Sequence, residues 1–144
     1  MDKTYVTKGQ LAGEWYLVNA EGETLGRLAS KVAALLIGKQ HPYYTPGVES
    51  NDHVVVINAS KITFHPSRLE SKMYYRHSGF PGGLKSDNLK GMLDKRPERL
   101  IQLTVKGMLP KNRLTKRFMD NLKVYAGAEH PHEAQTPQQY ELDK

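Results

Sequence analysis

The sequence predicts an α/β domain that begins with a strand, a helix and a second strand. Residues 15–18, Trp-Tyr-Leu-Val, are an aromatic and β-branched run that is typical of a strand. Residues 25–39 carry leucines and a valine at spacings of three and four, which is the pattern of an amphipathic helix. Residues 53–57 are an apolar run that suits a strand buried on both faces. This order predicts a βαβ unit, whose two strands are parallel.

Capping and turn-forming residues mark the ends of these first elements. Thr24 is a candidate N-cap for the helix, and Gly38 followed by Pro42 is a stop signal. Residues 19–22 are predicted to form a turn, and residues 40–52 a loop. The first half of the chain is therefore expected to be the scaffold.

The next part of the chain is predicted to contain a strand, a glycine-rich turn and a helix. Residues 72–77 suit a strand that leads into the turn at 78–83. A helix is predicted over residues 86–95, with Ser86 or Asp87 as its N-cap.

The last third is predicted to be helical first and irregular at its end. Pro97 is placed to open a helix that ends at Pro110. Residues 115–121 suit a short basic helix and residues 122–125 a final strand. From Gly127 onward the tail is rich in Pro, Gln and His and is expected to be irregular.

Length and composition are those of one ordinary folded domain. We expect a single domain over residues 1–144, with an N-terminal arm at 1–13 and an acidic tail at 128–144. The chain has no cysteine, which excludes disulfides and thiolate metal sites. It shows neither a secretory signal nor an apolar stretch of about 20 residues that could span a bilayer. We therefore expect a cytoplasmic protein with no membrane partner.

The positive charge is concentrated in the middle of the chain. Residues 1–58 carry five Lys or Arg against six Asp or Glu, and residues 128–144 carry one against four. Residues 59–127 carry fifteen against five, a net charge of +10. Such asymmetry indicates a partner rather than a fold. This concentration of positive charge favours a polyanion as the partner, and nucleic acid is the first candidate.

Two segments within this basic region suit RNA. Residues 106–123 hold six Lys or Arg and one acid, with irregular spacing, so a solvated surface face is the competing interpretation. Residues 72–85, KMYYRHSGFPGGLK, interleave aromatic, basic and glycine residues. Aromatic rings can stack on unpaired bases and glycines admit a phosphate closely. The competing interpretation is a strand with core tyrosines and a tight turn.

The sequence offers no clear catalytic, cofactor or metal site. No phosphate-binding loop, dinucleotide fingerprint, GxSxG or HExxH motif is present, and the carboxylates are scattered. His130 and His132 lie two apart but lack a third ligand nearby. We therefore predict no catalytic residue, no cofactor, no bound metal and no small-molecule substrate.

Five segments carry a resemblance to a known family. They are WYLVNAEGETLGRLAS at 15–30, VVVINASKI at 54–62, KMYYRHSGFPGGLK at 72–85, VKGMLPKNRL at 105–114 and LKVYAGAEHPHEAQ at 122–135. These segments occur in the order in which one family carries them. Through them the chain resembles the thirteenth protein of the large ribosomal subunit, in its bacterial form. The resemblance implies a three-layer α/β/α domain around a small parallel or mixed sheet. It also implies a structural constituent of the large subunit that binds ribosomal RNA early in assembly, beside neighbouring ribosomal proteins, and that is not an enzyme.

Within this framework we expect the basic residues to contact phosphate and the 76–85 turn to dock on folded RNA. Gly107 and Gly127 are expected to permit a close approach of backbone. The predicted RNA contacts are Arg76, His77, Ser78, Gly79, Lys85, Lys106, Gly107, Lys111, Arg113, Lys116, Arg117, Lys123, Tyr125 and Gly127.

Two alternatives remain at this point. A nucleotide-dependent or RNA-directed enzyme can be built on a βαβ scaffold, because fold alone does not set function. The second alternative is a regulatory RNA-binding module that acts away from the ribosome, and the sequence contains no feature that bears on it.

Overall fold

The computed structural model describes residues 11–141, and its centre is a four-stranded parallel sheet. The strands are β1 (Trp15–Asn19), β2 (His53–Ile57), β5 (Leu122–Val124) and β6 (Gln138–Gln139), in the order β5-β2-β1-β6. β1 pairs with β2 in register from Trp15 opposite His53 to Asn19 opposite Ile57. The predicted α/β class and the parallel pair are confirmed, and the sheet is parallel throughout rather than mixed.

Helix α1 (Leu25–Ile37) connects β1 to β2 and provides the first layer of the core. Thr24 is its N-cap residue, although its side chain makes no capping hydrogen bond. The helix ends where Gly38 adopts a left-handed backbone and its N–H donates to Ala34 and Leu35. Glycine reaches this conformation without strain. The predicted helix over residues 25–39 and its stop signal at Gly38 are therefore confirmed. The helix ends at Ile37, two residues earlier than predicted.

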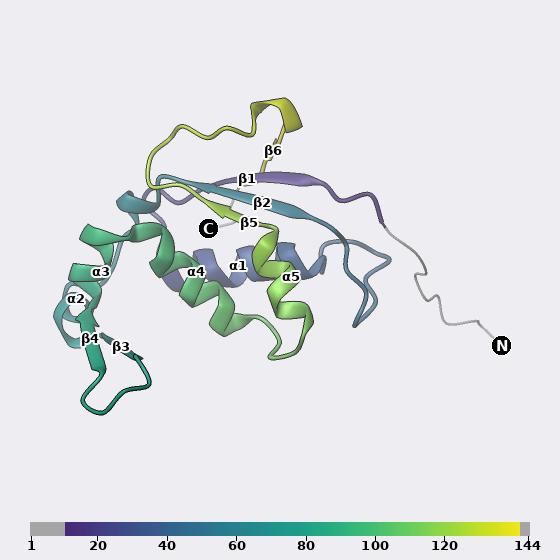
Figure 1. The fold of residues 1–144 in the computed structure, drawn as a ribbon. Helices are drawn as coiled ribbons and strands as arrows, with labels where there is room; N and C mark the ends of the chain where they lie inside the picture. The colour runs from purple at the N-terminus through teal and green to yellow at the C-terminus, as the bar shows by residue number, and fades with distance from the viewer. Residues whose placement is uncertain (1–10, 142–144) are drawn as a thin grey trace.

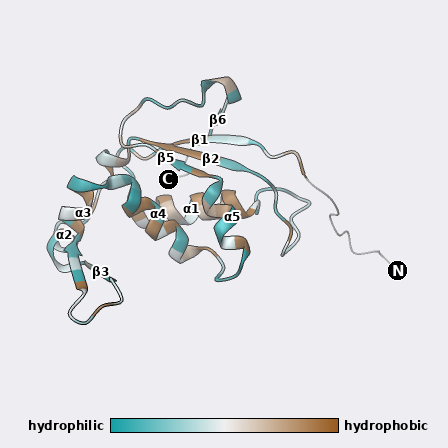
Figure 2. Ribbon diagram, viewed as in Figure 1, coloured by the Kyte–Doolittle hydropathy of each residue, from teal (hydrophilic) through white to brown (hydrophobic). Residues whose placement is uncertain are grey.

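Helices α4 (Pro97–Met108) and α5 (Leu114–Asp120) lie on the same side of the sheet as α1 (Figure 1). Pro97 stands in the first turn of α4, as predicted. α1 and β2 are mainly hydrophobic in colour, whereas α4 alternates between hydrophobic and hydrophilic (Figure 2). α4 therefore buries one side and exposes the other.

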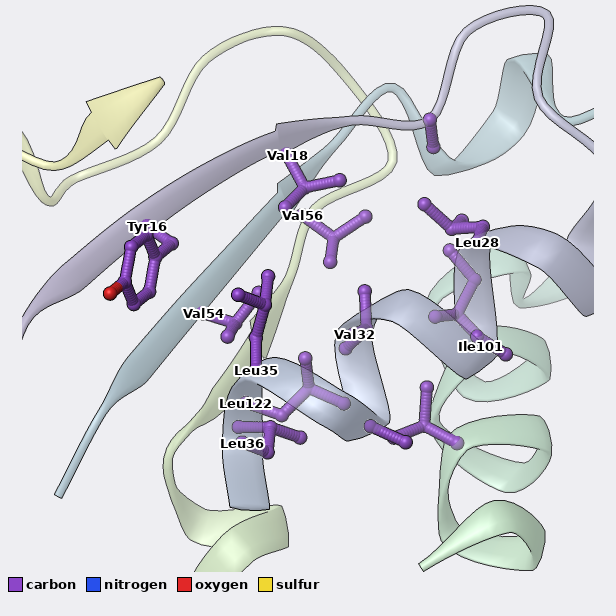
Figure 3. Packing of buried hydrophobic residues seen from close by; sticks show 14 of the residues in the cluster. Tyr16, Val18, Leu28, Val32, Leu35, Leu36, Val54, Val56, Ile101 and Leu122 are labelled. Carbon is purple, nitrogen blue, oxygen red and sulfur yellow. The ribbon is translucent and has the colours of Figure 1, made fainter. Parts of the chain in front are cut away.

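The main core lies between one face of the sheet and α1. Tyr16, Val18, Val54 and Val56 point from the strands toward Val32 and its neighbours on α1 (Figure 3). Ile101 closes the core from α4 and is fully buried. Each fully buried Val, Leu or Ile side chain stabilises the fold by roughly 1.5–3 kcal/mol relative to leaving it exposed. This packing fixes α4 against the scaffold.

The region between β2 and α4 packs around a second, smaller hydrophobic cluster. It comprises a 3₁₀ turn at Ala59–Lys61, α2 (Pro66–Ser71), the hairpin of β3 (Met73–His77) and β4 (Leu84–Asn88), and α3 (Leu89–Lys95). Leu89, Met92 and Leu100 are buried there against Phe64 and Tyr74.

The predicted helix over residues 86–95 begins later than expected. Ser86 and Asp87 lie in β4, and Asn88 is the N-cap of α3, where its side chain accepts a hydrogen bond from the Gly91 N–H at 2.8 Å. The capping prediction for Ser86 or Asp87 was therefore wrong. Pairing of Asp87 with Tyr74 and of Ser86 with Tyr75 holds these residues in the ladder. Tertiary pairing of this kind overrides local capping signals.

The second face of the sheet is covered by the C-terminal segment rather than by α-helices. This segment passes over the sheet and returns to it as β6, beside β1 (Figure 1). It contains one 3₁₀ turn, Glu133–Gln135, so the tail from Gly127 is more ordered than predicted. The three layers are thus the helices, the sheet and this segment. The predicted arm at 1–13 and the end of the predicted tail lie mostly outside the described residues.

Candidate nucleic-acid interface

The end of α4, the loop that follows it and the start of α5 hold the densest group of predicted RNA contacts. Leu109 and Phe118 are buried on either side of this loop and anchor it to the core. The Asn112 side chain accepts the Leu114 N–H at 3.0 Å, and the Thr115 hydroxyl donates to the Pro110 carbonyl. These contacts hold the turn in shape while its cations face solvent. The exposed predicted residues here are Lys106, Gly107, Lys111, Arg113, Lys116 and Arg117.

Most of these cations have no anionic partner within the protein. Among residues 11–141, no carboxylate oxygen lies within 4.0 Å of Lys106, Lys111, Arg113 or Lys116. Arg117 differs, because its Nη1 lies 3.3 Å from Glu49 Oε1 of the loop before β2. An unpaired group of like charges raises the energy of the free protein and favours a bound polyanion.

The β3–β4 hairpin forms a second group that projects from the body on the helical side (Figure 1). Arg76 and Lys85 are directly opposite each other in its ladder. At its tip, Gly79 and Gly82 have φ values of +91° and +71°, which favour glycine. The Gly79 N–H donates to His77 Nδ1 at 2.9 Å, which shapes the turn. All five residues predicted on this hairpin, Arg76, His77, Ser78, Gly79 and Lys85, are exposed.

Exposed aromatic rings accompany the charges of the hairpin. Tyr75 is 67% exposed and Phe80 is 74% exposed. Tyr74, in contrast, packs against the second cluster, and its burial raises the pKa of its hydroxyl. The competing prediction of core tyrosines therefore holds for Tyr74 and is wrong for Tyr75.

Arg96, at the junction of α3 and α4, and Arg99 of α4 connect the hairpin with the α4–α5 loop, and sequence reasoning missed both. One groove between the hairpin and α4 is lined by Arg76, Arg96 and Arg99, with Asp87 as its one acid. A second groove is lined by Arg96, Arg99 and Lys106, with Glu98 as its one acid. Positions 96, 99, 103 and 106 are spaced three, four and three apart, so this face was present in the helical periodicity. We use the name basic face for the exposed cations Arg76, Lys85, Arg96, Arg99, Lys106, Lys111, Arg113, Lys116 and Arg117.

Three predicted contacts, Lys123, Tyr125 and Gly127, lie apart from the basic face on the strand β5 and just after it. Lys123 donates to the Asp120 carbonyl at 3.0 Å. The Tyr125 hydroxyl is 2.8 Å from His132 Nε2, and the Gly127 carbonyl accepts the Asn58 N–H at 2.8 Å. The contacts of Tyr125 and Gly127 tie the C-terminal segment to the ends of β5 and β2 and give these two residues a structural role, whereas the contact of Lys123 is local to the junction of α5 and β5.

Histidine and tryptophan rings pack where this segment crosses the sheet. The rings of Trp15 and His53 stack with their centroids 4.3 Å apart, and His132 lies beside Trp15. Burial and the nearby charge of Lys123 lower the pKa of His53. Within residues 11–141, no cluster of three or more His, Cys, Asp or Glu is arranged to hold a metal. No helix in the same range is long and apolar enough to cross a membrane.

A parallel α/β scaffold that presents unpaired cations and exposed aromatic rings on one side is typical of a polyanion-binding protein. Comparison with known proteins identifies the family. The ribosomal protein L13 family matches residues 13–131. A relative from Symbiobacterium thermophilum is 52% identical over 143 residues, covering 99% of this chain and 100% of its own. One from Aquifex aeolicus is 54% identical over 141 residues, covering 97% and 98%.

Both relatives carry the name large ribosomal subunit protein uL13. The chain belongs to the ribosomal protein L13 family. It is therefore a ribosomal protein and not an enzyme, which confirms the family resemblance and rejects the nucleotide-dependent enzyme.

Proposed function

We propose that this protein binds large-subunit ribosomal RNA through the basic face and holds it against a rigid α/β scaffold. Family membership makes the chain a structural constituent of the large ribosomal subunit. The basic face is the single observation that carries the RNA proposal. Its cations lie on the hairpin, on α4 and from the α4–α5 loop into α5. Apart from Arg117, which pairs with Glu49, they have no carboxylate oxygen within 4.0 Å in the described part of the chain.

Charge placement favours RNA over a solvated surface. In a solvated face, acids and bases alternate and pair at helical spacings. Here Arg76 stands opposite Lys85, and like charges in directly opposed positions destabilise a strand pair. Phosphate groups between them would convert this repulsion into attraction and release condensed counterions.

The hairpin would supply contacts that depend on RNA shape. Tyr75 and Phe80 are exposed and can stack on unpaired bases, which double helices do not offer. The left-handed Gly79 at the tip leaves open space where a side chain would stand, so backbone can approach a phosphate. We propose that Ser78 and His77 contribute hydrogen bonds from the same tip.

The acidic C-terminal segment lies on the opposite side of the sheet from the basic face (Figure 1). Its net negative charge would repel phosphate, so this side suits a neighbouring ribosomal protein or solvent. Lys123 and Gly127 would then make, at most, a separate RNA contact. We further propose that residues 1–144 form one domain, since Leu25 and Phe64 pack against both hydrophobic clusters.

Binding early in subunit assembly follows from the same arrangement. A scaffold whose core is complete without RNA can present its charged face to RNA that is still folding. The two buried clusters need no RNA atom for their packing. A pulse-labelling experiment would then find the protein in the lightest large-subunit precursors.

The test is the salt dependence of binding to large-subunit ribosomal RNA by filter retention. The variant Lys111→Gln/Lys116→Gln removes two unpaired cations, and its slope of log K against log salt should fall by roughly 0.7–0.9 for each lost phosphate contact. The matched control Lys39→Gln/Lys61→Gln removes the same charge elsewhere and should keep the slope. Equal slopes for both variants would remove Lys111 and Lys116 from the interface.

A further inference from the structure

A groove of about 1060 Å³ opens between the start of α1, α2, the base of the hairpin and α4. It contains none of the cations that were predicted from the sequence, although Gly107 lies at its edge. Leu103 of α4 lines this groove and also the two grooves of the basic face. The groove therefore opens directly onto the basic face.

The floor of the groove is apolar and partly aromatic. It is made by Leu25, Phe64, Tyr74, Leu89 and Leu103, most of which belong to or pack on the second hydrophobic cluster. Leu89 is buried, whereas Leu103 is 39% exposed. Because these side chains are held by packing from below, the floor is a preformed surface for a flat, weakly polar group.

The rim of the groove carries positive charge without compensation. Arg27, Arg68 and Lys72 line it together with His65, and no Asp or Glu is among the lining residues. All three cations are exposed, and Lys72 Nζ lies 5.7 Å from the centre of the Tyr74 ring. The charge is thus positioned directly beside the apolar floor.

We propose that this groove holds one unpaired nucleotide of the bound RNA, with its base on the floor and its phosphates against Arg27, Arg68 and Lys72. This inference rests on the proposed function, because the RNA must first be bound at the basic face. A nucleotide combines a flat ring, whose faces stack on aromatic and apolar groups, with a phosphate that needs cations. The paired strands of an RNA duplex would leave the apolar floor unused.

Gly26 offers a way to fill the groove without disturbing the fold. It lines the groove from the first turn of α1, it is not one of the predicted RNA contacts, and a Cβ at this position meets nothing within 4 Å. We therefore compare Gly26→Phe, which would occupy the groove, with Gly26→Ala as its matched control. Thermal melting followed by circular dichroism checks that both variants fold.

The measurement is base-specific chemical probing of large-subunit ribosomal RNA together with filter-binding affinity. Wild-type protein and Gly26→Ala should protect at least one unpaired base that Gly26→Phe leaves reactive. The affinity of Gly26→Phe should fall roughly tenfold, as expected for the loss of one stacked base. Its salt slope should stay near the wild-type value, because the cations of the rim and of the basic face all remain in place to contact phosphate.

A second variant tests the rim. Arg68→Gln/Lys72→Gln should expose the same base and also lower the salt slope, by up to about two units. Agreement between the two variants on one base would locate that nucleotide in the groove.

Several outcomes would overturn the inference while leaving the proposed function intact. One is RNA binding in which Gly26→Phe changes neither affinity nor any base protection. Another is normal RNA binding by Gly26→Phe with poor incorporation into large subunits, which would assign the groove to a protein segment. If the wild-type protein itself fails to bind the RNA, the proposed function fails and the groove inference fails with it.

Discussion

Arg76 and Lys85 face each other across the β3–β4 ladder, on a hairpin that projects from the helical side of the molecule. The two charges repel each other in the free protein, since no carboxylate among residues 11–141 lies within 4.0 Å of either side chain. A pair of this kind costs stability on its own and therefore indicates an external anion.

Neutralising this hairpin pair should weaken RNA binding without weakening the fold. The variant Arg76→Gln/Lys85→Gln should lower the salt slope of binding by up to about two units. Its free energy of unfolding should be unchanged or slightly higher, because a like-charge pair is removed. Urea unfolding and filter binding on the same samples measure both. A loss of several kcal/mol of stability would instead show that the pair serves the fold.

Glu49 should compete with RNA for Arg117. The Arg117–Glu49 pair is exposed on its arginine side, so it is worth at most about 1 kcal/mol. Replacing Glu49 by Gln should release Arg117 and raise RNA affinity by up to about fivefold at low salt. Lys116→Ala should reduce the salt slope more than Arg117→Ala does, since Lys116 has no such pair. The reverse ranking would argue against competition by Glu49.

His53 should make stability depend on pH. Its pKa lies below the ordinary value of 6.5, because burial and the charge of Lys123 disfavour the protonated ring. The unfolded chain then takes up a proton more readily, so stability is fully present above pH 6.5 and falls as the pH drops further. His53→Phe keeps a ring against Trp15 and removes the titration. Urea unfolding between pH 7.5 and 5.5 should show a smaller loss for this variant, and an identical loss would exclude His53 as a contributor.

Two left-handed glycines should respond differently to alanine. Gly38 has a φ of +82°, and an added Cβ would stand 2.6 Å from the Ser50 Cβ. Gly47 has a φ of +87° but open space around it. Gly47→Ala should cost only the backbone strain of about 1–2 kcal/mol, and Gly38→Ala should cost distinctly more. Equal losses in urea unfolding would show that Ser50 moves aside freely.

The parts of the fold that the sequence predicted well are those with strong local signals. The apolar stripe of α1, the valine run of β2 and the proline that opens α4 are each visible within a single element. Such patterns survive folding because each element must bury its apolar side. The basic hairpin and the α4–α5 loop were found in the same way, from residues close together in the chain.

The misplaced elements depend on partners far away in the chain. Ser86 and Asp87 look like helix caps, yet their pairing with β3 makes them strand residues. The tail looks irregular by composition, yet Gln138 and Gln139 pair with β1. Neither pairing is visible locally, because the partner strand supplies the hydrogen bonds.

The sequence by itself determined the family, the α/β class and the region that carries the positive charge. These properties reside in ordered motifs, periodicity and composition, which need no coordinates. The tertiary structure decided which cations share a surface: it joined Arg96 and Arg99 to the hairpin, paired Arg117 with Glu49 and set Tyr125 apart. The physical reason is that packing of α4 on the core, and not distance along the chain, sets which side chains meet.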